Sequence, residues 1–111
     1  MEAFDLNGLL EQHRQQGRLY LEFLRQPSLS MGLYVLAAGA NDPQQPHTED
    51  EVYYIAAGQG LIEVNGEDQA VGPGSIVFVA ANVKHHFHSI KEPLQIIVFF
   101  APAEYSQQSP S

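Results

Sequence analysis

Histidine and carboxylate side chains are concentrated in the stretch QPHTEDEVYYIAAGQG, residues 45–60. Neutral imidazole and carboxylate groups are natural ligands of first-row transition metals. In an extended chain, alternate side chains share one face. Here that face would carry Gln45, His47, Glu49, Glu51, Tyr53 and Ile55. If Tyr53 and Ile55 are core residues, His47 and Glu51 point inward as half of a metal site; the alternative is that both are solvated at a strand end.

A second cluster lies in KHHFHSI, where His85, His86 and His88 fall within four residues. Alternation places His85 on one face with Phe87, and His86 with His88 on the other. If Phe87 packs in the core, His85 points inward; in the other register His86 and His88 form the ligand pair. Alternation alone leaves both registers open.

Composition limits the classes of function. The chain has 111 residues, of which 44% are hydrophobic, so it is long enough for one domain with its own core. Thirteen acidic against five basic residues give a net charge of −8, which excludes a nucleic-acid partner because phosphates would be repelled. The absence of cysteine excludes disulfides and thiolate ligands. We find no signal peptide and no membrane-spanning stretch, so we expect a cytoplasmic protein.

The elements that must position these residues are short. Residues 5–16 predict a helix, with Asp5 as N-cap and Gly17 as its end. Eight strands are expected after it: 18–24, 31–38, 51–57, 61–64, 68–71, 75–79, 85–90 and 94–100. Asn65-Gly66 favours a type I′ hairpin, since both residues tolerate positive φ, and Gly72-Pro73-Gly74 indicates another turn.

This pattern predicts a small antiparallel sandwich or barrel. We expect one domain over residues 1–101, with the barrel at about 18–101. The polar, proline-dotted residues 102–111 predict a flexible tail.

Residues 39–58 resemble the first motif of the cupin superfamily, G-x5-H-x-H-x3/4-E-x6-G. Gly39, His47, Glu51 and Gly58 stand at matching spacings, and Gln45 replaces the first histidine. The resemblance implies an all-β fold, an antiparallel double-stranded β-helix (jelly-roll or cupin barrel), here with a short N-terminal helix.

Residues 74–89 resemble the second cupin motif, G-x5-P-x-G-x2-H-x3-N. Gly74 and His85 match, while Ala80, Asn82 and Ser89 stand where the motif has Pro, Gly and Asn. The chain is thus similar to small single-domain proteins of the cupin-2 type. The match also favours the register in which His85 points inward.

Carried over by position, the resemblance implies that His47, Glu51 and His85 bind one divalent transition metal (Fe, Mn, Ni or Zn). Gln45 would be a weak ligand through its carbonyl oxygen or would contact a metal-bound water. Glu49 is a candidate substitute ligand or general base, or else a charge on the rim. Tyr53 and Phe87 are candidate pocket walls.

Three functions are compatible with such a site. The first is a metal-dependent enzyme, oxygenase-like, acting on a small molecule. The second is a barrel that binds a metal and a small ligand without turnover, as a sensor or carrier. The third is a barrel whose site has decayed and that serves only assembly. We also expect a homodimer, formed through the apolar segment 18–25.

Overall fold

The computed structural model describes residues 1–107 of the chain. Its elements follow the order α1 (Leu6–Gln16), β1 (Tyr20–Gln26), β2 (Leu29–Leu36), β3 (Asp50–Val64), β4 (Glu67–Val71), β5 (Ile76–Val79) and β6 (His85–Ala101). As predicted, Asp5 caps the helix by accepting from the Gly8 N–H, and Gly17 ends it in the left-handed conformation. None of the described helices is long and apolar enough to cross a membrane.

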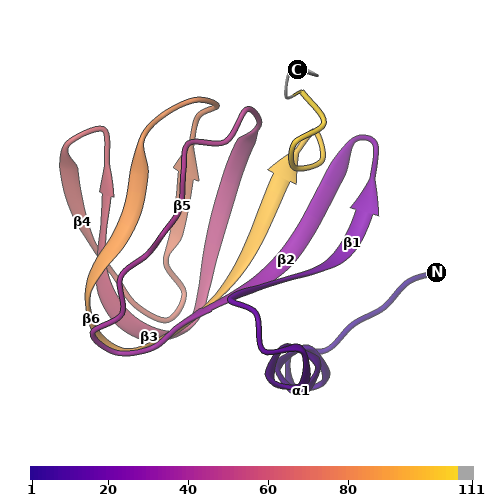
Figure 1. Cartoon of the computed structure of the whole chain (residues 1–111), viewed down its shortest axis with the longest axis horizontal. Coiled ribbons are helices and arrows are strands. Elements are labelled where there is room, and N and C mark those ends of the chain that lie inside the picture. The colour runs from indigo at the N-terminus through magenta and orange to yellow at the C-terminus, as the bar shows by residue number, and fades with distance from the viewer. Residues whose placement is uncertain (108–111) are drawn as a thin grey trace.

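All strand pairs are antiparallel, and the hydrogen-bonded order is β1-β2-β6-β3-β4, with β5 also paired to β3. Figure 1 shows these strands curving around a shared interior, with β3 and β6 as its two long members. Within residues 1–107 the sheet does not close into a barrel, because β1 and β4 end the order without pairing to each other. The double-stranded β-helix expected from the sequence is confirmed in this open form.

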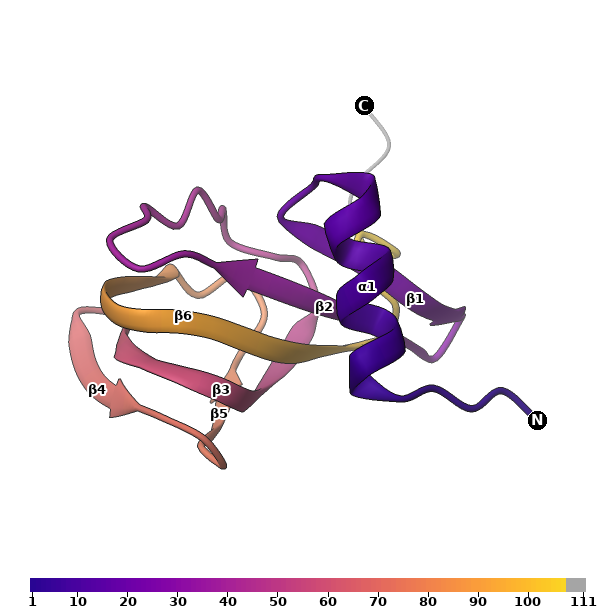
Figure 2. The same cartoon turned by 90° about the horizontal axis from the view of Figure 1, so that it is seen from below.

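Alternation along β3 and β6 builds the core. On β3 the side chains of Glu51, Tyr53 and Ile55 are buried, whereas Tyr54 is exposed. The largest group of buried apolar side chains in the described chain lies inside the curved sheet: Tyr34, Leu36, Tyr53, Ile55, Ile62, Val71, Val79, Phe87, Ile90, Leu94, Ile96, Val98 and Phe100. Helix α1 lies outside this core, against β1 and β2 (Figure 2). The alternation that points Tyr53 inward therefore also turns Glu51 inward.

Two pairs of expected strands are continuous in the structure. Residues 51–57 and 61–64 are both part of β3, and residues 85–90 and 94–100 are both part of β6. The pairing of β3 with β6 shifts its register between Ile55 and Leu61, where the two expected strands join. Gly58, at φ 97°, allows this because a Cβ there would lie 2.1 Å from the Pro93 carbonyl oxygen. Gly58 and Pro93 thus face each other in a bulge, and pairing resumes on both sides.

The predicted turns are confirmed. Asn65 and Gly66 have φ values of 50° and 86° and join β3 to β4. The Gly72 carbonyl oxygen accepts a hydrogen bond from the Ser75 N–H at 2.9 Å across the second turn.

Residues 102–107, part of the segment expected to be a flexible tail, contact the rest of the fold. Ala103 is buried, and its N–H lies 3.4 Å from the Pro27 carbonyl oxygen. The backbone N–H groups of Glu104 and Tyr105 donate to the side chains of Ser30 and Glu49. Polar side chains elsewhere in the fold hold this segment, which its own composition does not reveal. Residues 108–111 lie outside the described part of the chain.

Candidate metal centre

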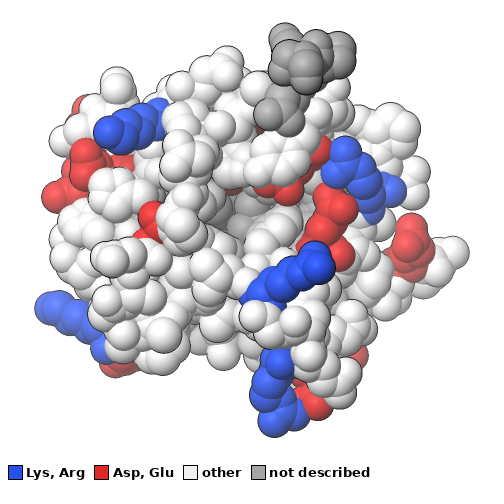
Figure 3. All heavy atoms as spheres, viewed as in Figure 1, with Lys and Arg blue, Asp and Glu red and all other residues white. Residues whose placement is uncertain are grey.

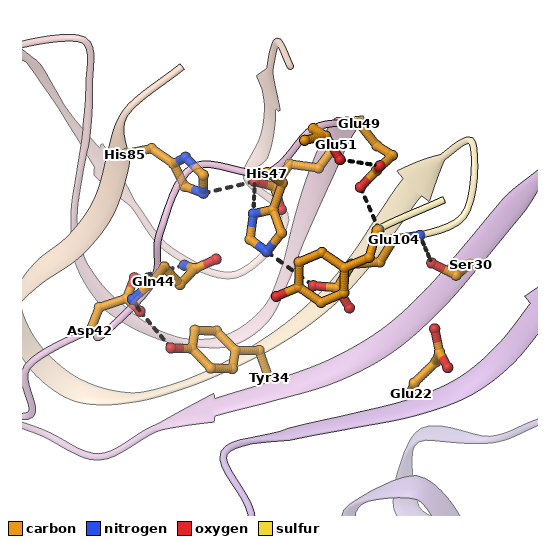
Figure 4. A network of polar contacts seen from close by, with 12 residues as sticks. Glu22, Ser30, Tyr34, Asp42, Gln44, His47, Glu49, Glu51, His85 and Glu104 are labelled. Carbon is orange, nitrogen blue, oxygen red and sulfur yellow. Dashed lines mark hydrogen bonds and ion pairs between the residues drawn. The ribbon is translucent and has the colours of Figure 1, made fainter. Parts of the chain in front are cut away.

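Two histidines and one glutamate meet inside the curved sheet. Glu51 lies at the start of β3, His85 at the start of β6, and His47 in the loop before β3. Their ligand atoms all lie within 4.8 Å of one another, and all three residues are buried. His85 Nε2 lies 2.7 Å and His47 Nδ1 lies 3.4 Å from Glu51 Oε1. Figure 4 shows both rings turned toward the Glu51 carboxylate.

The loop that carries His47 is fixed at both ends by polar contacts. Asp42 accepts hydrogen bonds from the Tyr34 hydroxyl at 2.5 Å and from the Phe87 N–H at 2.8 Å. The Asn82 N–H donates to the His47 carbonyl oxygen at 2.6 Å. These contacts tie the loop to β2, to β6 and to the segment before β6. His47 is therefore placed by tertiary contacts, because no strand or helix carries it.

Four buried atoms of the cluster lack a hydrogen bond of good geometry, although both imidazole nitrogens lie at ion-pair distance from Glu51 Oε1. They are His47 Nδ1, His85 Nε2 and both carboxylate oxygens of Glu51, and none has a partner in hydrogen-bond geometry among residues 1–107. Buried polar atoms of this kind are costly unless something pairs them. A divalent ion held by these nitrogens and oxygens would do so. The His85 Nδ1–H donates to the Val83 carbonyl oxygen at 2.9 Å, which leaves Nε2 free to accept a metal. The donor set therefore fits a transition metal.

The acidic surroundings shift the pKa values of these groups. Burial alone would lower the pKa of His47, but the carboxylates of Glu104 and Glu51 outweigh it and raise that pKa to about 9. Burial likewise opposes the charged form of His85, and the Glu51 carboxylate raises its pKa above the usual value. Burial favours a raised pKa at Glu51, yet the two imidazoles lower it. Glu51 is thus held as a carboxylate and attracts cations.

Gln45 and Glu49, the other two candidate ligands, lie in different surroundings. Gln45 is exposed and lies on a cavity wall. Glu49, the candidate substitute ligand, general base or rim charge, is buried, and its carboxylate accepts from the backbone N–H groups of Tyr105 and Gln107 at 2.6 and 2.9 Å. Burial would raise the pKa of Glu49, but the Thr48 hydroxyl and these two bonds lower it. Glu49 therefore holds the C-terminal segment and is turned away from the place of a general base.

Tyr53 and Phe87 are fully buried core residues and do not line the cavity described below. Their rings pack edge to face, with centroids 5.0 Å apart, and the Tyr53 hydroxyl donates to Gln44 Oε1 at 2.9 Å. Tyr53 also packs against His85, with centroids 5.9 Å apart. Both aromatic residues thus belong to the core, and Tyr53 contacts the centre through the His85 ring.

A cavity of about 370 Å³ opens beside His47. It is lined by Leu19, Tyr20, Tyr34, Pro43, Gln44, Gln45, His47, Val98, Phe100, Glu104 and Tyr105. Figure 3 shows the molecule hollowed near the middle of this face, with acidic side chains at the edge of the hollow. Tyr20 lies across Gly32, where a Cβ would be 2.1 Å from the tyrosine ring. Its hydroxyl is buried and has no hydrogen-bond partner within the described residues.

The model of the cupin domain matches residues 32–100 of this chain, well over half of it. The chain belongs to the cupin superfamily. A relative from Streptomyces coelicolor, described as an uncharacterised protein, is 44% identical over 104 residues, which are 94% of this cupin and 99% of the relative. Acireductone dioxygenase of Bacillus subtilis is 30% identical over 56 residues, which are 46% of this cupin and 31% of the dioxygenase.

Solved structures agree with the fold. The protein TT1209 of Thermus thermophilus superposes with a TM-score of 0.73 at 24% identity, covering 93% of this cupin and 99% of that chain. KdgF from Halomonas sp. superposes with a TM-score of 0.68 at 20% identity, covering 75% and 76%. The fold suggested by the two motifs is thus shown, and the cupin contains a His47, Glu51 and His85 cluster able to hold a metal.

Sequence reasoning missed the residues that complete the surroundings of the cluster. Glu104 Oε2 lies 3.0 Å from His47 Nε2, and the Tyr105 ring lies 5.8 Å from the His47 ring. Both follow β6 in a stretch whose composition is typical of a loose end. The available signal was an acid and a tyrosine directly after an apolar strand, which is too common to indicate a site.

Proposed function

We propose that this cupin is a mononuclear metal-dependent enzyme, oxygenase-like, that acts on a small molecule. The observation that carries the proposal is the buried cluster of His47, Glu51 and His85, four of whose polar atoms have no hydrogen-bond partner within residues 1–107. Two imidazoles and one carboxylate form a donor set that suits non-haem Fe(II) with open coordination positions, and zinc also accepts it.

In this proposal His47 Nδ1, His85 Nε2 and a Glu51 oxygen hold the ion. A bound divalent metal would supply Lewis-acid or redox chemistry to a substrate beside it. The aromatic and aliphatic walls of the cavity would bind and orient that substrate, and its volume of about 370 Å³ is in the range of small-molecule sites. The similarity to acireductone dioxygenase supports this class of chemistry, although this cupin spans only about a third of that enzyme.

One observation favours a second function, the binding of a metal and a small ligand without turnover. Glu104 and Tyr105 lie against His47 and restrict the space beside the centre. Side chains that restrict access to the metal centre in this way suit a site that keeps its ligand bound.

The first test is elemental analysis of untagged protein purified without chelator and then reconstituted with Fe(II), Mn(II), Ni(II) or Zn(II). We expect close to one metal per chain in the wild type and very little in His47→Ala and His85→Ala. The matched control is His13→Ala, because His13 lies on helix α1 and is in no group of described residues able to hold a metal ion. Wild-type protein that stays metal-free with every ion contradicts the proposal.

Turnover separates the two functions. Dioxygen uptake is measured for the Fe(II)-loaded protein with oxidisable small molecules, including acireductone. Uptake by the wild type and not by His85→Ala supports the enzyme. Stoichiometric metal with ligand binding and no turnover supports the non-catalytic barrel.

A further inference from the structure

Glu104, which lies outside both sequence motifs, contacts His47 of the candidate centre. Its Oε2 lies 3.0 Å from Nε2 of His47, and Nδ1 of the same ring faces Glu51 at 3.4 Å. Figure 4 shows His47 between the two carboxylates, with Glu51 on one side and Glu104 on the other. The imidazole is therefore held at both nitrogens.

The fold fixes the place of Glu104. Its backbone N–H donates to Ser30 Oγ at 2.9 Å, and its carbonyl oxygen accepts from Arg25 Nη2 at 2.9 Å. Ala103 before it is buried, and Glu49 accepts from the N–H of Tyr105 after it at 2.6 Å. Contacts from β1, from β2 and from the loop before β3 thus converge on this short segment. The side chain of Glu104 is only 13% exposed, unlike a mobile surface acid.

We propose that Glu104 is a positioning residue of the metal centre, accepting the Nε2–H of His47 so that Nδ1 points toward Glu51 and His85. The proposal rests on the proposed function, because it concerns the same ion. An imidazole gives one nitrogen to a given ion, and the other ring N–H of a metal-binding histidine is regularly bound by a carboxylate or a carbonyl oxygen. His85 has such a partner in the Val83 carbonyl oxygen, and Glu104 is the equivalent partner for His47.

This role also accounts for the departure at Gln45. Gln45, which stands where the motif has its first histidine, is exposed on the wall of the cavity that His47 also lines. Glu104 enters from the opposite end of the chain and brings a negative charge instead. With Glu51, it balances the two positive charges of a divalent ion, and its hydrogen bond increases the basicity of the His47 ligand atom.

The test is the dissociation constant for Co(II), read from its visible absorption, in wild type, Glu104→Ala and Glu104→Gln. We expect affinity to fall about 10- to 100-fold in Glu104→Ala. Glu104→Gln keeps an acceptor for the Nε2–H without the charge, so we expect partial recovery relative to alanine. The control is Glu11→Ala, which removes a carboxylate paired with Arg14 on helix α1; its affinity should equal that of the wild type.

Thermal melting of the metal-free variants checks that each is folded, and Glu104→Gln decides alone if Glu104→Ala does not fold. Equal affinity in the wild type and in every folded Glu104 variant overturns the positioning role and leaves the proposed function standing. X-ray absorption reports the oxygen ligands of the bound Co(II). Loss of one such ligand in Glu104→Ala also overturns the positioning role, because Glu104 would then coordinate the metal directly. A wild type that binds no Co(II) removes both proposals together.

Discussion

The carboxylate of Glu49 accepts hydrogen bonds from the backbone N–H groups of both Tyr105 and Gln107. Glu49 lies between His47 and Glu51 in the chain and is as buried as either, yet it faces the C-terminal segment. We expect Glu49→Ala to release that segment and lower the free energy of unfolding by about 1–3 kcal/mol, because charge-assisted bonds to buried groups are lost. Denaturant unfolding measures the loss. A variant as stable as the wild type, with residues 103–107 equally protected from hydrogen exchange, would contradict it.

The contact between Gly58 and Pro93 predicts a large effect of one methyl group. In Gly58→Ala the new Cβ would lie 2.1 Å from the Pro93 carbonyl oxygen at a φ of 97°, so both strands must move. We expect a loss of at least about 3 kcal/mol, or failure to fold. Gly39→Ala is the matched control, with positive φ and open space around it, and should cost about 1 kcal/mol. Similar losses of unfolding free energy in the two variants would show that the close contact between Gly58 and Pro93 does not hold β3 and β6 together.

The two tyrosines of the cavity should respond in opposite directions to loss of their hydroxyl groups. The Tyr20 hydroxyl is buried without a partner among the described residues, so Tyr20→Phe should leave the stability of the ligand-free protein unchanged or raise it by about 1 kcal/mol. The Tyr34 hydroxyl donates to Asp42, so Tyr34→Phe should lower stability by about 1–2 kcal/mol. Thermal and denaturant unfolding provide the comparison. A clear loss in Tyr20→Phe would mean that its hydroxyl is bonded in solution.

Metal affinity should rise with pH. The pKa of His47 in the metal-free protein is raised to about 9, so at pH 6–8 the ring is protonated and a metal must displace that proton. Each unit of pH in this window should strengthen apparent affinity by about tenfold for the His47 proton, and the raised pKa of His85 adds to that slope. The pKa of Glu51 is lowered, so Glu51 is already ionised there and adds no slope. Competition against a chelator at pH 6, 7 and 8 tests this, and affinity independent of pH would refute it.

We propose a homodimer formed through residues 18–25. Strand β1 ends the hydrogen-bonded order, so one of its edges is free for pairing within the described chain. Light scattering should give twice the chain mass of 12.3 kDa. Leu19, exposed beside this edge, provides the test variant Leu19→Glu, which should shift the protein toward monomer. Phe78→Glu, in another exposed apolar position, is the control, and dissociation only in that variant would place the interface on β5 instead.

Local pattern was sufficient for much of the fold and for the inner ligands. Alternation along 51–55 placed Glu51 inward with Tyr53, since a strand has a period of two and the apolar side chains choose the buried face. Motif spacing selected His85 over His86 and His88, and the structure has His85 buried while the other two pair with outer acids. Asn65-Gly66 determined its hairpin for the same local reason, as both residues accept positive φ.

Contacts between distant segments decided the rest. Gly58 and Pro93 each lie between two expected strands, but side by side they form a bulge that keeps β3 and β6 continuous. Glu104 belongs to a stretch with no apolar periodicity, and the carboxylate of Glu49 and the hydroxyl of Ser30 hold it beside His47. Such placement depends on groups more than fifty residues apart in sequence. The sequence by itself determined the inward faces of β3 and β6, because a strand alternates with a period of two. The tertiary structure placed His47 and brought Glu104 beside it, because both positions depend on contacts between distant segments.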